Sequence, residues 1–167
     1  MLLPLFFTVL ILWLILVKWR NLLTHLPLTL AGVLAAALAL FNNLAGHFLA
    51  PMGILLTPAV VLMAAWLILS ARTGSSLLKV ALLALIIIGH DVGIKLYAGG
   101  QHDSEGQGWM IAFLFMGLLP AYGLLLFHLT RPGPEPRYQR VLSLLLFPLL
   151  LLGYLYCFGN LGMGRSY

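Results

Sequence analysis

The sequence predicts an all-α fold, a polytopic integral membrane protein built as a bundle of six transmembrane helices with short loops. Of the 167 residues, 62% are hydrophobic and only 8% are charged, against roughly 25% charged residues in an ordinary soluble domain. The apolar residues fall into six runs, each about as long as the 17 to 25 residues that a helix needs to cross a bilayer. No run alternates polar and apolar residues as a barrel strand would. We therefore expect a single transmembrane domain over residues 1–167.

The six predicted spans are 2–17, 26–50, 54–71, 77–98, 109–130 and 141–158. The first run is followed by Lys18 and Arg20 and by no small-residue cleavage pattern, which predicts a retained helix and not a signal peptide. The second run is rich in Ala and Gly, and small side chains let helices approach closely in lipid. We expect it to lie centrally in the bundle. Residues 51–53 (Pro-Met-Gly) predict a very short turn before the third span.

The basic residues predict the orientation. With six spans, seven of the nine lie on one side of the membrane: Lys18, Arg20, Arg72, Lys79, Arg131, Arg137 and Arg140. Because positive charge marks the cytoplasmic side, we expect both termini and the loop 99–108 outside, in a bacterial inner membrane. The formal charge of +5 is scattered among the span ends, which argues against nucleic acid as a partner. Cys157 is the single cysteine, so no internal disulfide can form.

One polar stretch, residues 89–109, interrupts the apolar sequence. It contains three of the four acidic residues, Asp91, Asp103 and Glu105, together with His90 and His102. Charges and histidines at membrane depth are costly and mark functional sites by default. The stretch is therefore our candidate site.

A second polar cluster is predicted at the same depth. His90 and Asp91 lie seven or eight residues before the end of the fourth span, and Asn42 and Asn43 lie equally far before the end of the second span. Asn43 and His47 are four residues apart and share one helix face. We expect the second and fourth spans to pack together, with Asn43 or His47 within one side chain or one water of His90 or Asp91.

Two glycines flank the candidate histidine. Gly89 and Gly93 have the small-xxx-small spacing that permits close helix packing in membranes. We expect them to let the Ala-rich second span approach His90.

Metal binding is one chemistry that these residues could support. His90, with His102, Asp103 or Glu105 from the loop and His47 from the second span, would supply three or four ligands. Imidazole and carboxylate ligands suit a divalent metal such as zinc. Adjacent helix residues diverge by about 100°, so His90 and the next residue are poorly placed to bind one ion together. No known metal-binding spacing supports this set.

A metal-free alternative uses the same region. The catalytic set would be His90, Asp91, His47 and Asn43, with Asp91 orienting a histidine that acts as a general base. His90 and Asp91 could equally pass protons to water.

Structural roles are the competing interpretation. Asp91 and Lys95 are four residues apart, in the order that favours an ion pair. Asn42, Asn43 and His47 would then be interhelical hydrogen-bonding residues, and Tyr154 an aromatic residue of the membrane interface.

Three functions remain open. The first is a membrane-embedded, metal-dependent or metal-free enzyme that acts on a lipid or other amphiphile. The second is a non-catalytic subunit or assembly factor, which would bind other membrane subunits. The third is a proton- or ion-coupled transporter component, for which an interrupted helix would be expected. Membrane lipids are partners in every case.

Overall fold

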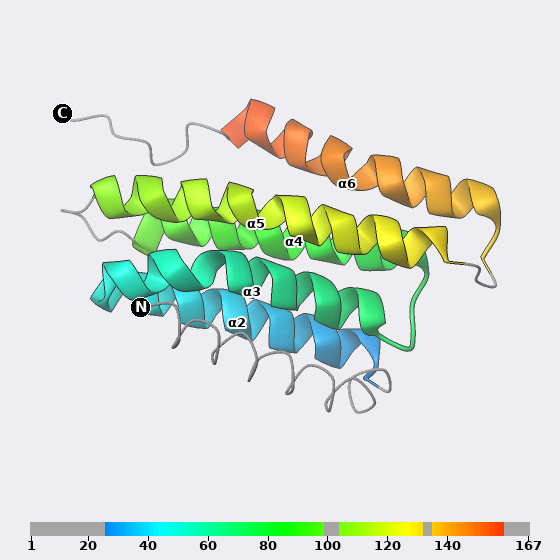
Figure 1. The fold of residues 1–167 in the computed structure, drawn as a ribbon, viewed down its shortest axis with the longest axis horizontal. Helices are drawn as coiled ribbons and strands as arrows, with labels where there is room; N and C mark the ends of the chain where they lie inside the picture. The colour runs from blue at the N-terminus through cyan, green and yellow to red at the C-terminus, as the bar shows by residue number, and fades with distance from the viewer. Residues whose placement is uncertain (1–25, 99–103, 132–134, 159–167) are drawn as a thin grey trace, which may run out of the picture.

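The computed structural model describes residues 26–98, 104–131 and 135–158, and the regular structure in these ranges is entirely helical (Figure 1). Its elements are α2 (Leu28–Phe48), α3 (Ala50–Ser70), α4 (Ser76–Gly93), the π-helical turn η1 (Ile94–Ala98), α5 (Ser104–Thr130) and α6 (Arg137–Phe158). Five of the described helices, with η1 extending α4, are long and apolar enough to cross a membrane, as expected of an integral membrane protein. The predicted first span, 2–17, lies outside the described residues.

The turn predicted at residues 51–53 is wrong. Helix α3 begins at Ala50, and the chain reverses at the single residue Leu49, which has φ −142° and ψ 72°. Pro51 occupies the first helical turn, where a missing N–H costs little. The reversal also needs Gly53, because a Cβ there would overlap the backbone of Gly46 in α2.

Two other helices begin earlier than predicted. Helix α5 starts at Ser104, inside the predicted acidic loop 99–108, and α6 starts at Arg137 instead of 141. In both cases polar residues continue the helix beyond its apolar stretch. Hydropathy locates the part of a helix that lies in hydrocarbon, whereas the backbone hydrogen bonding can extend into the polar region.

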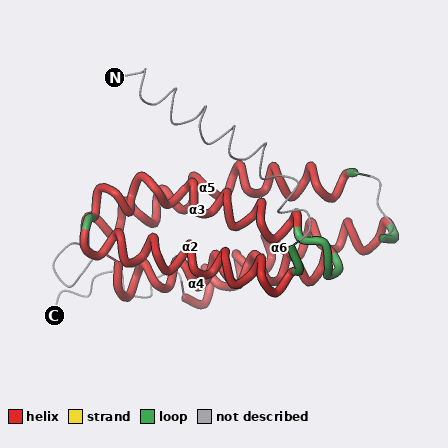
Figure 2. The backbone as a smooth tube through the Cα atoms, turned by 90° about the horizontal axis from the view of Figure 1, so that it is seen from below, coloured by secondary structure: helices red, strands yellow, loops and turns green. Residues whose placement is uncertain are grey.

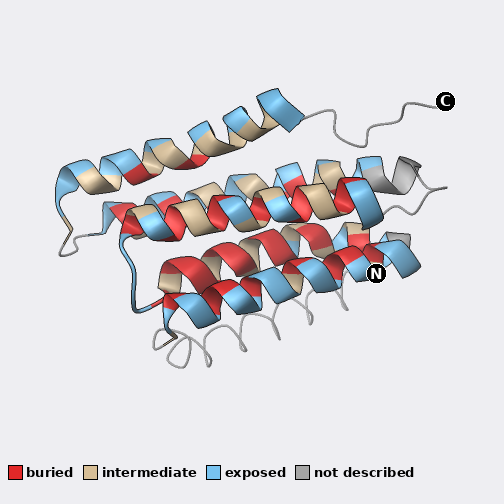
Figure 3. Ribbon diagram, turned by 180° about the vertical axis from the view of Figure 1, so that it is seen from behind, coloured by how far each residue is buried: buried red, intermediate tan, exposed pale blue. Residues whose placement is uncertain are grey.

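Successive helices run in opposite directions (Figure 1) and lie with their axes roughly parallel (Figure 2). Helix α4 makes most of the contact between α6 and the rest of the bundle. It packs against α2, α3 and α6, while α3 packs against α2 and α5. Helix α6 lies along one side of the bundle (Figure 1). Figure 3 shows that most of the surface of α6 is exposed or partly exposed, and its only buried residues are Ser143 and Phe147.

Small residues hold α2 against its neighbours, as the sequence predicts. Ala31, Ala35, Ala39 and Gly46 are buried on α2. A Cβ added at Gly32 would lie 2.9 Å from a methyl carbon of Leu82 in α4. The two helices therefore pack through the Ala- and Gly-rich face.

Because the helices alternate in direction, their termini lie at two opposite ends of the bundle, and these ends differ in composition. At one end, called here the basic end, α3 and α5 finish and α4 and α6 begin, with five basic residues: Arg72, Lys79, Arg131, Arg137 and Arg140. At the other, called here the histidine end, α2 and α4 finish near His47, His90 and Lys95.

Buried polar contacts join the helices at the basic end. Lys79 Nζ donates to the carbonyls of Leu69 at 3.2 Å and Ala71 at 2.6 Å, where a cation stabilises the C-terminus of α3. Glu135 accepts a hydrogen bond from the Ser76 N–H at 2.8 Å. Burial raises the pKa of Glu135, but the Ser76 hydrogen bonds and the positive charge of Lys79 outweigh it and bring the pKa below its ordinary value of 4.5.

Candidate functional site

Polar side chains gather in the interior of the histidine end and form two separate networks on different sides of α4. We call Asn42, Thr57 and His90 the amide network, and Asp91, Lys95 and Tyr154 the carboxylate network. The exposed fractions of His90 and Asp91 are both 2%, and that of Lys95 is 4%. Because His90 and Asp91 are neighbours on a helix, their side chains point about 100° apart. Each therefore enters a different helix interface.

The amide network joins α2, α3 and α4. Asn42 donates from Nδ2 to Thr57 Oγ1 at 2.8 Å and to His90 Nε2 at 3.1 Å. Thr57 in turn donates to the Gly53 carbonyl at 2.8 Å. Since Thr57 has one proton to give, it must accept from Asn42, which fixes the orientation of the amide. His90 is therefore neutral in this network, with Nε2 as acceptor and the proton on Nδ1.

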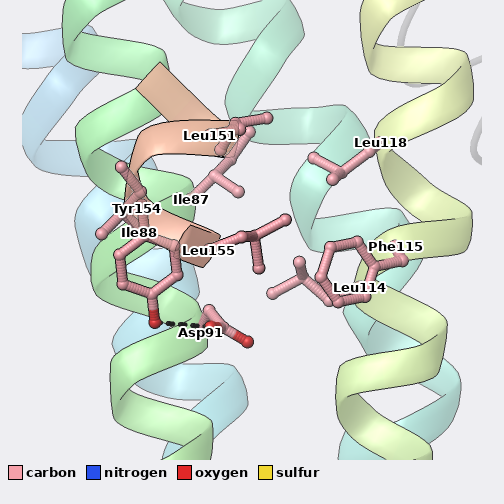
Figure 4. A pocket seen from close by; sticks show the side chains of 9 residues that line it. All are labelled: Ile87, Ile88, Asp91, Leu114, Phe115, Leu118, Leu151, Tyr154 and Leu155. Atoms are coloured by element: carbon pink, nitrogen blue, oxygen red, sulfur yellow. Dashed lines mark hydrogen bonds between the residues drawn. The ribbon is translucent and has the colours of Figure 1, made fainter. Parts of the chain in front are cut away.

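The carboxylate network joins α4, η1 and α6. Lys95 Nζ lies 2.7 Å from Asp91 Oδ2, and the Tyr154 hydroxyl donates to the same oxygen at 2.6 Å (Figure 4). Lys95 Nζ is also 3.5 Å from the Tyr154 hydroxyl and 5.2 Å from the centre of its ring. One carboxylate oxygen thus receives both an ammonium and a phenol in an apolar environment.

The second oxygen of the carboxylate is different. Asp91 Oδ1 is buried and has no hydrogen-bond partner among the described residues, and Figure 4 shows it pointing away from Tyr154. Asp91 and Tyr154 line a cavity of about 10 Å³ between α4, α5 and α6, whose other lining residues are all apolar: Ile87, Ile88, Leu114, Phe115, Leu118, Leu151 and Leu155. This volume is close to the minimum for one water molecule. An unpartnered buried carboxylate oxygen marks a position where a hydrogen-bond donor would be stabilised.

The π-helical turn η1 lies directly beside the carboxylate network. Helix α4 ends at Gly93, the backbone N–H of Ile94 bonds to the carbonyls of His90 and Asp91, and Lys95 belongs to η1. Such widened turns are rare and occur often at functional sites. The regular helix is therefore interrupted where the charged residues lie.

The residues that the sequence assigned to one catalytic set have different partners among their described contacts. His47 donates from Nδ1 to the Tyr97 carbonyl at 2.9 Å, and the two rings stack with centroids 4.4 Å apart. Asn43 is buried against Gly93. His90 instead contacts Asn42. The second and fourth spans do pack together, but the described contacts place His47 and Asn43 elsewhere along the same interface.

The two glycines also differ from each other. A Cβ at Gly93 would overlap the amide nitrogen of Asn43, whereas a Cβ at Gly89 would meet nothing within 4 Å. Close approach of α2 to α4 therefore depends on Gly93, and the expectation for Gly89 is wrong.

The predicted metal site has no support in the described part of the chain. No group of three or more His, Cys, Asp or Glu residues within the described residues could hold a metal ion. His102 and Asp103 lie outside these residues, and Glu105 is in the first turn of α5 with a side chain that is not described. The described contacts of His90 and His47 are with other protein groups. Zinc binding remains an untested prediction.

Two members of the networks were missed in the sequence. Tyr154 was expected at the membrane interface, yet it reaches Asp91 from α6. Thr57 carries no sequence signal beyond being a hydroxyl residue one position before Pro58. Thr57 and Tyr154 lie near the same end of the bundle as Asn42 and His90, so depth along the spans is a sequence signal that groups all four residues.

The geometry brings a carboxylate, a phenol and an ammonium together in one apolar site. The thiol of Cys157 is exposed and belongs to neither network. No family model, curated protein or solved structure matches the chain.

Proposed function

We propose that this chain is a six-span protein of a bacterial inner membrane, with both termini outside, and that it is a membrane-embedded enzyme acting on a lipid or other amphiphile. The carboxylate network is its acid–base centre. The observation that carries this proposal is the unpartnered Oδ1 of Asp91 beside an apolar cavity. The lining of this cavity, apolar with a few polar groups, is of the kind found in ligand sites, and its volume of about 10 Å³ is that of one small group.

Each residue of the network has a distinct role. Asp91 accepts a proton from the bound ligand. Lys95 lies 2.7 Å from Asp91 Oδ2 and compensates the negative charge of the carboxylate in its apolar surroundings. Tyr154 donates to Asp91 Oδ2 and so leaves Oδ1 as the oxygen that faces the ligand.

His90 has a positioning role in this proposal. Its Nε2 accepts from Asn42, so the amide network fixes α4 against α2 and α3. The adjacent Asp91 is thereby held toward α6. The catalytic set predicted from sequence is reduced to Asp91 and its two partners.

A proton-coupled transporter component is the second candidate, because of η1. The interruption of α4 beside a buried ion pair is the feature that transport sites at broken helices share. In that case Asp91 would exchange protons between the two sides of the membrane and would convert no ligand. The third possibility, a non-catalytic subunit or assembly factor, needs only a structural ion pair.

Substitution in nanodiscs separates the three functions. Wild type and Asp91→Asn are reconstituted with a total bacterial lipid extract, and lipid conversion is followed by mass spectrometry. The enzyme proposal expects conversion by wild type and its loss in Asp91→Asn, when activity is measured per folded molecule. Tyr154→Phe should lower the rate, and Tyr156→Phe is its matched control because Tyr156 is 93% exposed.

The alternatives give different results. Proton flux into vesicles that depends on Asp91, without lipid conversion, supports the transporter component. Equal loss of folded protein in Asp91→Asn and Lys95→Met, with no change in activity per folded molecule, supports the structural role and refutes the acid–base centre.

Cysteine labelling tests the topology. In a Cys157→Ala background, Ser104→Cys should react with a membrane-impermeant maleimide from outside, and Arg137→Cys only after the membrane is opened. The reverse pattern would refute the orientation that the basic residues predict.

A further inference from the structure

The charges around the cavity restrict what it can bind. Asp91 and Lys95 neutralise each other at 2.7 Å, and Tyr154 contributes a neutral hydroxyl. A charged headgroup brought to Asp91 Oδ1 would add a third, uncompensated charge among apolar side chains, which is costly. The site therefore favours an uncharged group.

The unused hydrogen-bonding position on Asp91 determines whether the ligand group must donate or accept a hydrogen bond. An ionised carboxylate only accepts hydrogen bonds, and Oδ1 has no partner in the described part of the protein. The ligand atom that meets it must therefore be a donor. A hydroxyl satisfies this requirement, whereas an ether or an ester oxygen does not.

The size and lining of the cavity determine how large and how apolar the ligand can be. Its volume of about 10 Å³ has room only for a group of about the size of one water molecule, such as a hydroxyl. Leu114 and Phe115 of α5 and Leu151 and Leu155 of α6 form an apolar wall. The rest of the ligand does not fit in the closed cavity, and a hydrocarbon chain can lie along this wall only when α5 and α6 separate.

Access lies between α5 and α6. Asp91 Oδ1 is covered in the described conformation, so a ligand reaches it only when these helices separate. Helix α6 packs mainly on α4 and much less on α5, and few of its residues are buried. The ligand therefore enters sideways from the lipid phase.

We infer that the cavity between α4, α5 and α6 binds the hydroxyl group of an uncharged amphiphile, a long-chain alcohol in the chemical sense, through a hydrogen bond to Asp91 Oδ1. This inference rests on the proposed function for its site and names the class of ligand. It makes no assumption about which bond of the ligand is changed.

Competition labelling tests this class directly. A photoreactive hexadecanol is crosslinked to the purified protein, and labelled peptides are mapped by mass spectrometry. We expect labels within 114–118 and 151–155, and competition by hexadecanol at least tenfold better than by its methyl ether, which keeps the oxygen but lacks the donor. Hexadecylamine and hexadecyl phosphate should also compete more weakly. Equal competition by alcohol and ether, or stronger competition by either charged probe, overturns the inference.

Substitutions supply the second readout. In Asp91→Asn the amide oxygen would take the bonds from Lys95 and Tyr154, which leaves the NH₂ group facing the ligand. We therefore expect the alcohol-to-ether ratio to fall toward one. Leu151→Trp should block labelling, whereas Leu149→Trp, on the exposed side of α6, should not. If the ratio is unchanged in folded Asp91→Asn, Asp91 is not the acceptor.

The two proposals fail separately. Selective alcohol binding without conversion of any lipid leaves this inference standing and refutes the enzyme. Asp91-dependent conversion of a charged lipid, without selective alcohol binding, supports the enzyme and refutes the inferred ligand class.

Discussion

Removing both partners of the Asp91–Lys95 pair should cost less stability than the sum of the two single removals. At 2.7 Å, two unit charges attract by about 6 kcal/mol at an effective dielectric constant of about 20. Desolvation offsets much of this in the native pair. A single substitution keeps the desolvation of the remaining charge and loses the attraction, so Lys95→Met or Asp91→Asn should each cost about 3 to 5 kcal/mol.

The double variant isolates the interaction. With both charges absent, the cost should be smaller than the sum of the two singles, with a coupling energy of about 2 to 3 kcal/mol. Tyr154 modulates this value because its hydroxyl also stabilises Asp91 Oδ2. Part of the stabilisation of the Asp91 carboxylate therefore persists in Lys95→Met.

The assay is unfolding in mixed detergent micelles, followed by helical circular dichroism for the wild type, the two singles and the double variant. Lys95→Met combined with Glu135→Gln is the control cycle, since Glu135 lies at the basic end and the two sites should add. If the changes in the free energy of unfolding of Asp91→Asn and Lys95→Met add to that of the double variant within about 0.5 kcal/mol, the two charges do not interact. This result would refute the ion pair as the centre of the network.

Three further predictions follow from individual contacts. Gly93→Ala should lose about 1 to 3 kcal/mol of stability by overpacking against Asn43, while Gly89→Ala, with open space around it, should be neutral or stabilising in the same unfolding assay. Asn42→Ala should cost about 1 to 3 kcal/mol because His90 Nε2 loses its donor, and a normal melting curve would contradict this. The lowered pKa of Glu135 contributes stability that is present above its unfolded pKa and is lost as the pH falls through the lower folded value. The stability that is lost below about pH 4.5 should therefore be smaller in Glu135→Gln than in wild type.

Periodicity and hydropathy predict the helices well and their ends poorly. The five described helices correspond to predicted spans, since a helix in hydrocarbon needs a fixed length of apolar residues. Their starts differ because hydropathy does not report hydrogen bonding outside the hydrocarbon. Pro51 was assigned to a turn from its residue type, yet the first turn of a helix accepts proline.

The contact of His90 with the second helix was predicted from sequence, but the individual side-chain partners were not. Depth along each span placed His90 beside the polar residues of the second helix, and Asn42 does contact it. Depth gives no rotation about the helix axis, so the sequence could not separate the interface of His90 from that of Asp91. The role of Tyr154 depends on α6 packing against α4, a long-range contact that no local pattern records.

The attachment of α6 connects ligand binding to access. Near the basic end, Arg140 Nη1 donates to the Arg131 carbonyl at 2.8 Å, which ties the start of α6 to the end of α5. At the histidine end, the described polar contacts of α6 are those of Tyr154 with Asp91 and Lys95. The proposed ligand bonds to Oδ1 while Tyr154 bonds to Oδ2, so both bonds can form together. We therefore expect the end of α6 nearest the cavity to move away for the ligand to enter, while the start of the helix stays attached to α5, and the Tyr154 bond to close the helix again after binding.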